Sequence, residues 1–341
     1  MFRNLWNIEN IVRSPLLARY YDLFHCPHLS PIALAGIPRV TTIHDLIPLL
    51  RPELVSDKSR LVFAKLLRFN LHHSTHIIAV SETTRRDLIQ HCNVPPDRIS
   101  VIYEAASSHF RPIPLPQAVT PLRSINLLDS SGQVTPYFLF IGNIEPKKNL
   151  KRLLLAFKQF AASNPQGYRL VIVGAKAWGY RPVQPLLEEL IQQGRLIWTG
   201  YLPSHYLPAL LSCARAFVFP SLVEGFGLPV LEAMACGCPV ITSHIPAITE
   251  VCGDAALQVN PLSVPEIYQA IDRLSWDDDL CAQLRQKGLR RNPLFSWDIC
   301  ADQTMQVYQS LCHPTPHLIS QEKRNFVSLP NAIPNPNKKG M

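Results

Sequence analysis

Two glutamates stand eight residues apart around a turn that contains two glycines. Glu224 opens the segment Glu-Gly-Phe-Gly-Leu-Pro-Val-Leu-Glu, and Glu232 closes it. An apolar run precedes the turn, Pro229 suits the first position of a helix, and Gly237 suits its end. The pattern predicts a strand, a glycine turn and a helix whose free N–H groups attract an anion such as a diphosphate. A carboxylate at such a turn can also bind sugar or ribose hydroxyls, or stabilise a positively charged transition state.

The sequence weighs a structural role against a functional one differently for the two glutamates. A glutamate early in a helix often only complements the helix dipole, and this interpretation stays open for Glu232. Glu224 lies in the turn itself, where glycines let the backbone approach a ligand closely. Its position at the end of a predicted strand therefore favours a functional role.

A second glycine turn spans residues 142–149, directly after the apolar run 137–141 and before a segment with helical spacing. Lys147 and Lys148 lie in this turn, where lysines can neutralise phosphate charge beside a helix N-terminus. A pair of lysines alone would favour an exposed, solvated turn. The position between a strand and a helix favours phosphate binding.

His44 follows the strand predicted over residues 39–43 and precedes Asp45, so it lies at the carboxyl end of a strand. A structural histidine and a functional one are both consistent with this position. The other histidines and the nine scattered cysteines show no metal-ligand spacing, which favours reduced cysteines and no zinc site. The acidic run Asp277–Asp279 is better interpreted as a helix start than as a metal site.

The chain of 341 residues is long enough for two domains, and its 47% hydrophobic and 17% charged residues are typical of a globular protein. The net charge of +8 suits phosphorylated substrates or an anionic membrane surface, so we expect peripheral contact with a membrane. The lack of a basic stripe interleaved with aromatic residues argues against nucleic acid. No signal segment and no run of 18 apolar residues occur, which predicts a cytoplasmic location, with peripheral contact at the inner face of the membrane.

Apolar periodicity predicts the elements that position these residues. Strands are expected over residues 22–26, 39–43, 77–80, 99–103, 137–141, 169–173, 196–199, 216–220, 239–242 and 256–259. Helical spacing is found over residues 5–12, 16–20, 59–73, 150–162, 183–193, 205–213, 264–274 and 280–287, and Ser81 begins another helix. The regular alternation predicts an α/β fold with doubly wound parallel sheets and ligands at the carboxyl ends of the strands.

The same pattern divides the chain into five parts. We expect an N-terminal domain, a proline-rich linker without periodicity, a C-terminal domain, a final helix that crosses over, and a disordered tail. Their boundaries are residues 1–110, 111–136, 137–294, 295–312 and 313–341.

The chain resembles the retaining glycosyltransferases of the family-4, group 1 type. The resemblance is carried by Glu224–Glu232 as the family's E-x7-E motif and by the Gly-x5-Lys turn over residues 142–149. Further matches are Phe219-Pro220-Ser221, Thr42-Ile43-His44-Asp45 and residues 246–251. It implies the GT-B fold, in which two Rossmann-like doubly wound domains face a cleft, with an incomplete N-terminal, acceptor-side domain and a nucleotide-sugar-binding C-terminal domain.

The resemblance also implies roles for individual residues. Glu224 would contact the donor sugar at its catalytic end, Glu232 the nucleotide ribose, and Lys148 the diphosphate as the leaving group departs. His44 would approach the transferred sugar from the N-terminal domain. The remaining positions expected to bind the nucleotide sugar are Gly142, Asn143, Lys147, Gly225, Phe226, Gly227 and Leu228. The family needs no cofactor and usually no metal, because lysine and the helix N-terminus take the cation's part.

Two positions depart from the family pattern. Many relatives carry arginine where this chain has Asn143, so Lys147 compensates or the diphosphate is bound less tightly. The family also begins with a strand and a glycine-rich turn, but no such turn precedes Gly36. Loss of that strand would expose a central sheet edge. A misassigned start, a degraded paralogue or a second chain that covers the edge would each explain this.

The resulting hypothesis is the transfer of a hexose, with retention, from a nucleoside-diphosphate sugar to an acceptor hydroxyl of a glycan or lipid-linked precursor. GDP-mannose and UDP-glucose are the expected donors, and the turn Glu145–Asn149 favours mannose. The alternatives are a non-catalytic nucleotide-sugar-binding protein and a sugar-nucleotide epimerase on the same fold. A dehydrogenase is disfavoured, because no G-x-G-x-x-G follows any predicted strand.

Overall fold

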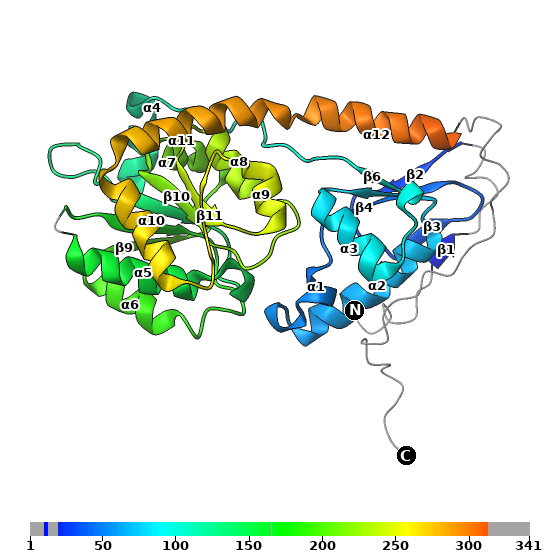
Figure 1. Ribbon diagram of the computed structural model, residues 1–341, viewed down its shortest axis with the longest axis horizontal. Coiled ribbons are helices and arrows are strands. Elements are labelled where there is room, and N and C mark those ends of the chain that lie inside the picture. Colours follow the sequence, from blue (N-terminus) through cyan, green and yellow to red (C-terminus); the bar gives the residue numbers. More distant parts are fainter. Residues whose placement is uncertain (1–9, 13–19, 165, 313–341) are drawn as a thin grey trace, which may run out of the picture. The chain divides into compact units, whose positions relative to one another are not determined.

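The computed structural model describes residues 10–12, 20–164 and 166–312 (Figure 1). The chain forms two compact units. Unit 1 takes the residues up to Tyr103 together with those from Asp298 onward, and unit 2 is the continuous segment Glu104–Trp297.

Within the described residues, unit 1 holds a sheet of four parallel strands in the order β2-β4-β5-β6. These strands are β2 (Phe24–Cys26), β4 (Arg39–Ile43), β5 (His76–Ala79) and β6 (Ile99–Val101). A separate parallel pair consists of β1 (Asn10–Val12) and β3 (Ile32–Leu34). The helices of unit 1 are α1 (Ile47–Leu50), α2 (Asp57–His73), α3 (Glu82–Cys92) and, from Asp298 onward, α12 (Trp297–Cys312).

Alternate residues of the unit 1 strands face opposite sides of the sheet, and each side has its own core. Ile77 of β5 packs with Leu67 of α2 on one side. Ile78, the next residue, packs with Val40 of β4 and with Val307 of α12 on the other. The last helix of the described chain therefore covers one face of the sheet that the first strands build.

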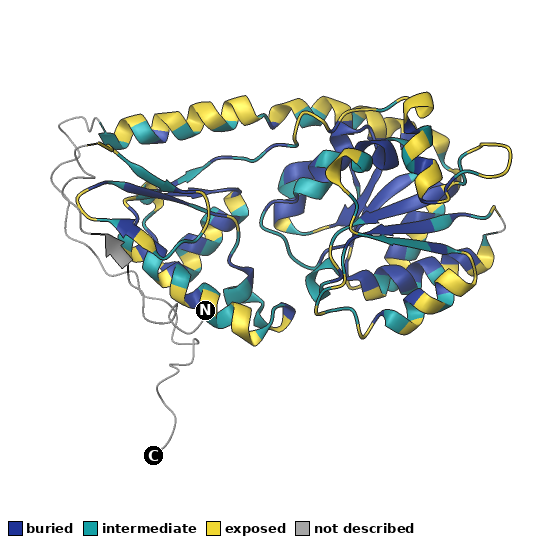
Figure 2. Cartoon of the chain, turned by 180° about the vertical axis from the view of Figure 1, so that it is seen from behind, coloured by how far each residue is buried: buried dark blue, intermediate teal, exposed yellow. Residues whose placement is uncertain are grey.

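Unit 2 holds six parallel strands in the order β12-β11-β10-β7-β8-β9, among the residues described. They are β7 (Tyr137–Ile141), β8 (Arg169–Val173), β9 (Leu196–Gly200), β10 (Ala216–Phe219), β11 (Val240–Ser243) and β12 (Leu257–Val259). Figure 2 shows the inner strands in the buried colour, as expected for a parallel sheet with helices on both faces. The chain moves from β7 outward to β9 and then returns to the other side of β7 with β10. This reversal is a topological switch point, the usual place of a ligand in such sheets.

Helices cover both faces of this sheet. One core cluster joins it to α5 (Leu150–Ser163), α6 (Gln184–Gln192), α10 (Val264–Trp276) and part of α11 (Asp278–Arg291). The other joins it to α4 (Leu115–Ser124), α7 (Leu207–Cys213), α8 (Leu228–Ala235) and α9 (Pro246–Cys252). Short 3₁₀ turns at Pro52–Leu54, Pro96–Arg98, Pro146–Lys148, Ser204–Tyr206 and Asn292–Leu294 complete the units.

Two helix starts follow the prediction. Ser81 caps α3, because its hydroxyl accepts a hydrogen bond from the backbone N–H of Thr84 at 3.0 Å. Asp277 caps α11 in the same way, from Leu280 at 2.9 Å. The acidic run is therefore a helix start, as expected.

The predicted linker over residues 111–136 is wrong. Most of its first half forms α4, whose Ala118 and Leu122 are fully buried in the unit 2 core. Proline at the start of a helix removes no needed hydrogen bond, so Pro116 is compatible with α4. Pro121, inside the helix, obscures its periodicity.

The expected helical spacing near the N-terminus is also wrong in part, because residues 10–12 form β1. The other residues of that prediction, at 5–9 and 16–19, and the tail expected at 313–341 lie outside the described residues. No helix in the described part of the chain has both the length and the apolar character needed to cross a membrane.

Candidate active site

The switch point brings the two glycine turns together. Strands β7 and β10 are parallel neighbours, so the turn after β7 and the turn after β10 emerge at the same edge of the sheet. The backbone N–H of Leu222 donates to the carbonyl of Lys147 at 2.8 Å and joins the two turns directly. The predicted phosphate turn and the predicted E-x7-E turn therefore form one surface.

Lys148 and Glu224 form an ion pair on this surface. Lys148 Nζ lies 2.7 Å from Glu224 Oε1, and the two side chains are 14% and 10% exposed. The ammonium group also lies 4.6 Å from the centre of the Phe219 ring, where a cation–π attraction adds to the pair. The ammonium group of Lys148 and the carboxylate of Glu224 thus neutralise each other at a site from which most water is excluded.

A glycine at the end of β8 allows a close approach to the predicted phosphate turn. Gly174, at the end of β8, has φ +152°, and a Cβ atom at this position would lie 2.0 Å from the carbonyl oxygen of Gly142. Only glycine allows the two strand ends to approach so closely. The sheet edge therefore presents bare backbone next to Lys148.

The turn before α8 depends on a glycine as well. Gly227 has φ +114°, and a Cβ atom there would lie 2.5 Å from Ile248 Cδ1. Gly225 and Phe226 precede it, and Phe226 is buried with its ring edge-on to Phe295 at 5.8 Å. The helix begins at Leu228, so Pro229 is its second residue and not its first.

Glu232 lies on α8, on the first full turn beyond Leu228. It is half-buried, and burial raises the pKa of its carboxyl group from 4.5 to about 7. Near neutral pH this carboxyl group is therefore divided between its neutral and ionised forms. A group in this state can either donate or accept a hydrogen bond.

Asn149 holds the surface together, although the sequence did not single it out. It is 4% exposed and adopts a left-handed conformation with φ 58° between Lys148 and α5. Its amide nitrogen donates to the carbonyls of Pro220 at 2.9 Å and Pro261 at 2.6 Å. One side chain thus ties the turns after β7, β10 and β12, and fixes the backbone next to Lys148.

Asn143 and Lys147 have local partners. Asn143 is exposed, and its side-chain oxygen accepts a hydrogen bond from the N–H of Ala175 at 3.2 Å. Lys147 Nζ lies 4.0 Å from a carboxylate oxygen of Glu145, on the same turn. Asn143 therefore supports the loop after β8, and the charge of Lys147 is partly balanced by its neighbour.

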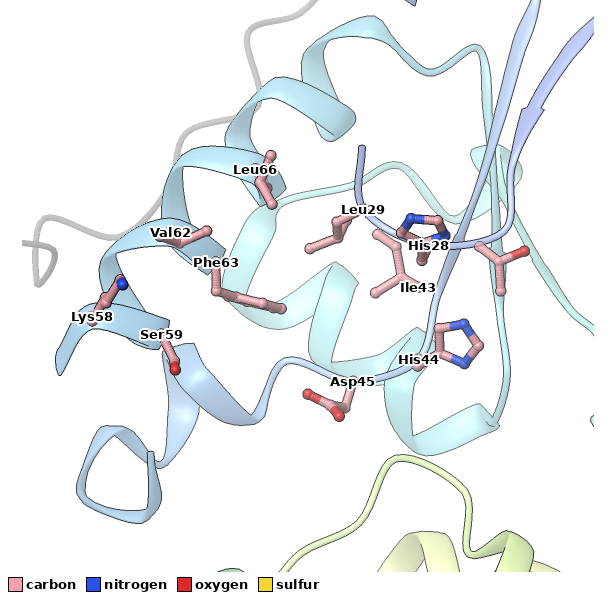
Figure 3. Close-up of a pocket in the computed structure, with 11 residues that line it drawn as sticks. His28, Leu29, Ile43, His44, Asp45, Lys58, Ser59, Val62, Phe63 and Leu66 are labelled. Carbon is pink, nitrogen blue, oxygen red and sulfur yellow. The ribbon is translucent and has the colours of Figure 1, made fainter. Parts of the chain in front are cut away.

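His44 belongs to unit 1, where it lines an open pocket of about 660 Å³ (Figure 3). Its Nε2 donates to the carbonyl of Pro27 at 2.9 Å, because a carbonyl oxygen can only accept. The lining side chains come from the end of β4, the segment His28–Leu29 and the first half of α2: Thr42, Ile43, His44, Asp45, Lys58, Ser59, Val62, Phe63 and Leu66. The α2 residues are absent from the predicted site, because their spacing indicates simply a buried helix face.

Among the residues that the structure describes, no cluster of three or more His, Cys, Asp or Glu side chains could hold a metal ion. The expectation of a metal-free reaction stays a prediction.

The fold, two parallel α/β units with glycine turns at the switch point of the second, is that of the GT-B glycosyltransferases. Two family models match the chain: "Glycosyl transferases group 1" over residues 131–291 and "Glycosyltransferase Family 4" over residues 1–106. The O-antigen chain mannosyltransferase B of Escherichia coli is 34% identical over 316 residues, which cover 88% of this chain and 81% of that protein.

Other relatives differ in length. The serotype-specific mannosyltransferase WbdA of Escherichia coli is 31% identical over 76% of this chain, which spans only 32% of WbdA. Among solved structures, Anabaena Alr3699/HepE in complex with UDP and glucose matches with a TM-score of 0.69 at 20% identity, over 86% of this chain and 79% of that one. The chain belongs to the group 1 glycosyltransferases of family 4, and it is a glycosyltransferase enzyme.

Proposed function

We propose that this enzyme transfers a mannosyl residue, with retention, from GDP-mannose to a hydroxyl group of a glycan or lipid-linked acceptor. The curated relatives support mannose, because mannosyltransferase B and WbdA are both named for its transfer. UDP-glucose is the alternative donor, in keeping with the structure of HepE in complex with UDP and glucose.

The ion pair between Lys148 and Glu224 is the observation that carries the proposal. In a nucleotide sugar, the anomeric carbon is bonded directly to the diphosphate. A group that binds the diphosphate and a group that binds the sugar must therefore lie side by side. Lys148 and Glu224 meet this requirement, with 2.7 Å between their charged atoms.

In the proposed reaction, the diphosphate replaces Glu224 as the partner of Lys148. The bond between the anomeric carbon and the phosphate oxygen breaks, and the negative charge on the departing diphosphate is stabilised by Lys148 and the N–H groups at the start of α8. The acceptor oxygen attacks from the face that the diphosphate leaves, and its proton passes to the departing phosphate oxygen. Glu224, released from the lysine, accepts hydrogen bonds from the sugar hydroxyls.

Two further residues of unit 2 complete the proposed donor site. Glu232 accepts hydrogen bonds from the ribose, and the bare backbone at Gly142 admits the diphosphate. A role for His44 of unit 1 toward the transferred sugar stays a prediction from the family resemblance.

The experiment is an assay of purified protein with four radiolabelled donors: GDP-mannose, UDP-glucose, GDP-glucose and UDP-mannose. Each donor is tested with and without mannoside acceptors. Release of GDP and formation of an α-linked product are expected with GDP-mannose, and Glu224→Ala is expected to abolish both. Turnover with UDP-glucose alone would replace the donor in the proposal. A β-linked product would refute retention, and equal turnover by Glu224→Ala would refute the assigned site.

A further inference from the structure

The loop that follows β8, over residues 174–182, runs beside the glycine turn over residues 142–149. The backbone N–H of Ile144 in that turn donates to the carbonyl of Ala175 at 3.0 Å. The N–H of Gly179 donates in return to the carbonyl of Ile144 at 3.2 Å. The loop is therefore fixed by its backbone against the turn of the proposed donor site.

Trp178 stands at the corner of this loop. The N–H of Tyr180 donates to the carbonyl of Ala177 at 3.1 Å, which makes Trp178 and Gly179 the central residues of a β-turn. A Cβ atom on Gly179 would lie 2.8 Å from Cδ of Pro146, so the turn packs closely on its neighbour. The Trp178 side chain is nevertheless 52% exposed. A large aromatic ring on a fixed backbone favours recognition, because little conformational freedom is left to lose on binding.

A cation lies in the same loop, two residues before Trp178. Lys176 Nζ is 4.3 Å from the centre of the Tyr180 ring and 5.3 Å from the centre of the Trp198 ring. These two rings are stacked, with their centres 5.6 Å apart. Attraction to the ring faces holds the ammonium group in place, while the Lys176 side chain stays exposed. The loop thus presents an aromatic face together with a positioned hydrogen-bond donor.

We propose that this loop is a subsite for the acceptor glycan, in which Trp178 stacks on the C–H face of a pyranose ring and Lys176 donates to the hydroxyl groups at its rim. A sugar ring has an apolar face and polar edges, so an aromatic face beside a cationic donor complements both. This inference rests on the proposed function. It adds a contact on unit 2 to an acceptor side that the family resemblance assigns to the N-terminal domain.

The position of the loop favours the acceptor over the nucleoside of the donor. Tyr180 and Trp198 pack against the core that joins the sheet to α5, α6 and α10. Glu232, which is proposed to bind the ribose, lies on α8, whose buried residues belong to the core on the opposite face of the sheet. A nucleoside held at Glu232 therefore extends from that other face, and Trp178 is left for the second substrate.

The test is ¹⁹F NMR of the full chain, labelled with 5-fluorotryptophan and titrated with α-linked mannotetraose in the absence of a donor. The chain has five tryptophans, and Trp178→Tyr identifies the resonance of Trp178 by its loss. We expect this resonance to shift when mannotetraose is added. Trp178→Ala should raise both the Kd and the acceptor KM for mannotetraose about tenfold, and Trp178→Tyr, which keeps an aromatic face, should raise them less.

Trp276→Ala is the matched control, because it removes an indole ring that is 64% exposed at the end of α10 and should leave both constants unchanged. A Trp178 resonance that mannotetraose does not move would overturn the proposal, and so would equal losses in the two alanine variants. A shift caused by GDP alone, with weaker GDP binding by Trp178→Ala, would overturn it by assigning the ring to the nucleobase. The titration needs no donor, so its failure overturns the subsite alone, whereas absence of transfer from every donor refutes the proposed function.

Discussion

Replacing Glu232 by glutamine should make the folded protein more stable at pH 8. Burial raises the pKa of this carboxyl group from 4.5 to about 7. A tenfold change in proton affinity corresponds to about 1.4 kcal/mol, so keeping the group ionised in the folded state costs up to about 3 kcal/mol. Glutamine has nearly the same shape and carries no charge, and it avoids this cost.

The sign of the effect follows from proton linkage. The folded state holds its proton more tightly than the unfolded state, so the contribution of Glu232 to stability is greatest below pH 4.5 and is lost as the pH rises through 7. The variant and the natural protein should therefore have similar melting temperatures near pH 4.5. At pH 8 the variant should melt about 6–12 °C higher, because the cost is about 3 kcal/mol and about 1 kcal/mol corresponds to 2–4 °C for a domain of this size.

Differential scanning calorimetry between pH 4.5 and 8 measures this difference, and ¹³C NMR of labelled glutamate measures the titration itself. Glu224→Gln is the matched control, because Glu224 balances Lys148 at 2.7 Å and its replacement should lower stability. A melting difference at position 232 that does not change with pH would refute the reasoning. A titration of Glu232 near pH 4.5 would refute it as well.

Further predictions concern the donor site. Ribose hydroxyls donate to Glu232 only while its carboxyl group is ionised, so the affinity for the nucleotide sugar should fall about tenfold from pH 8 to pH 6. Calorimetric titration measures this affinity and should show no such fall in Glu232→Gln. Lys148→Met should lower kcat at least about 100-fold in the donor assay, and a rate near that of the natural protein would remove it from the mechanism. Gly174→Ala should destabilise unit 2 by more than about 2 kcal/mol, whereas Gly194→Ala, which meets open space, should cost less in the same melting experiment. Asn149→Asp sets a carboxylate against two carbonyl oxygens and should weaken GDP binding, so an unchanged Kd would contradict its positioning role.

Much of unit 2 could be predicted from the sequence. Its strands are buried on both faces, so they occur as short apolar runs, and the runs 137–141 and 169–173 coincide with β7 and β8. Prolines misled the prediction at α4, because they usually mark loops and here stand in a helix that buries only Ala118 and Leu122. The short elements β1 and β3 hold too few residues to show a period.

The candidate site was predictable only where the topology dictates it. Lys148 and Glu224 are 76 residues apart, yet both follow strands that meet at the switch point, so their proximity follows from the fold. The role of Asn149 was not predictable, because its partners are carbonyl groups, which every residue type supplies. The pocket beside α2 was missed for a related reason, since apolar helix residues give no sign of whether they meet a neighbour or a cavity.

The return of α12 to unit 1 has a consequence for how the protein is made. Unit 2 is one continuous segment, so it can complete its core while later residues are still in the ribosome. Unit 1 cannot, because Val40 and Ile78 on one face of its sheet pack against Val307, which is synthesised more than 200 residues later. Unit 1 is therefore the first unit to be translated and the last to complete its fold. Its exposed sheet face must be protected until α12 has been synthesised.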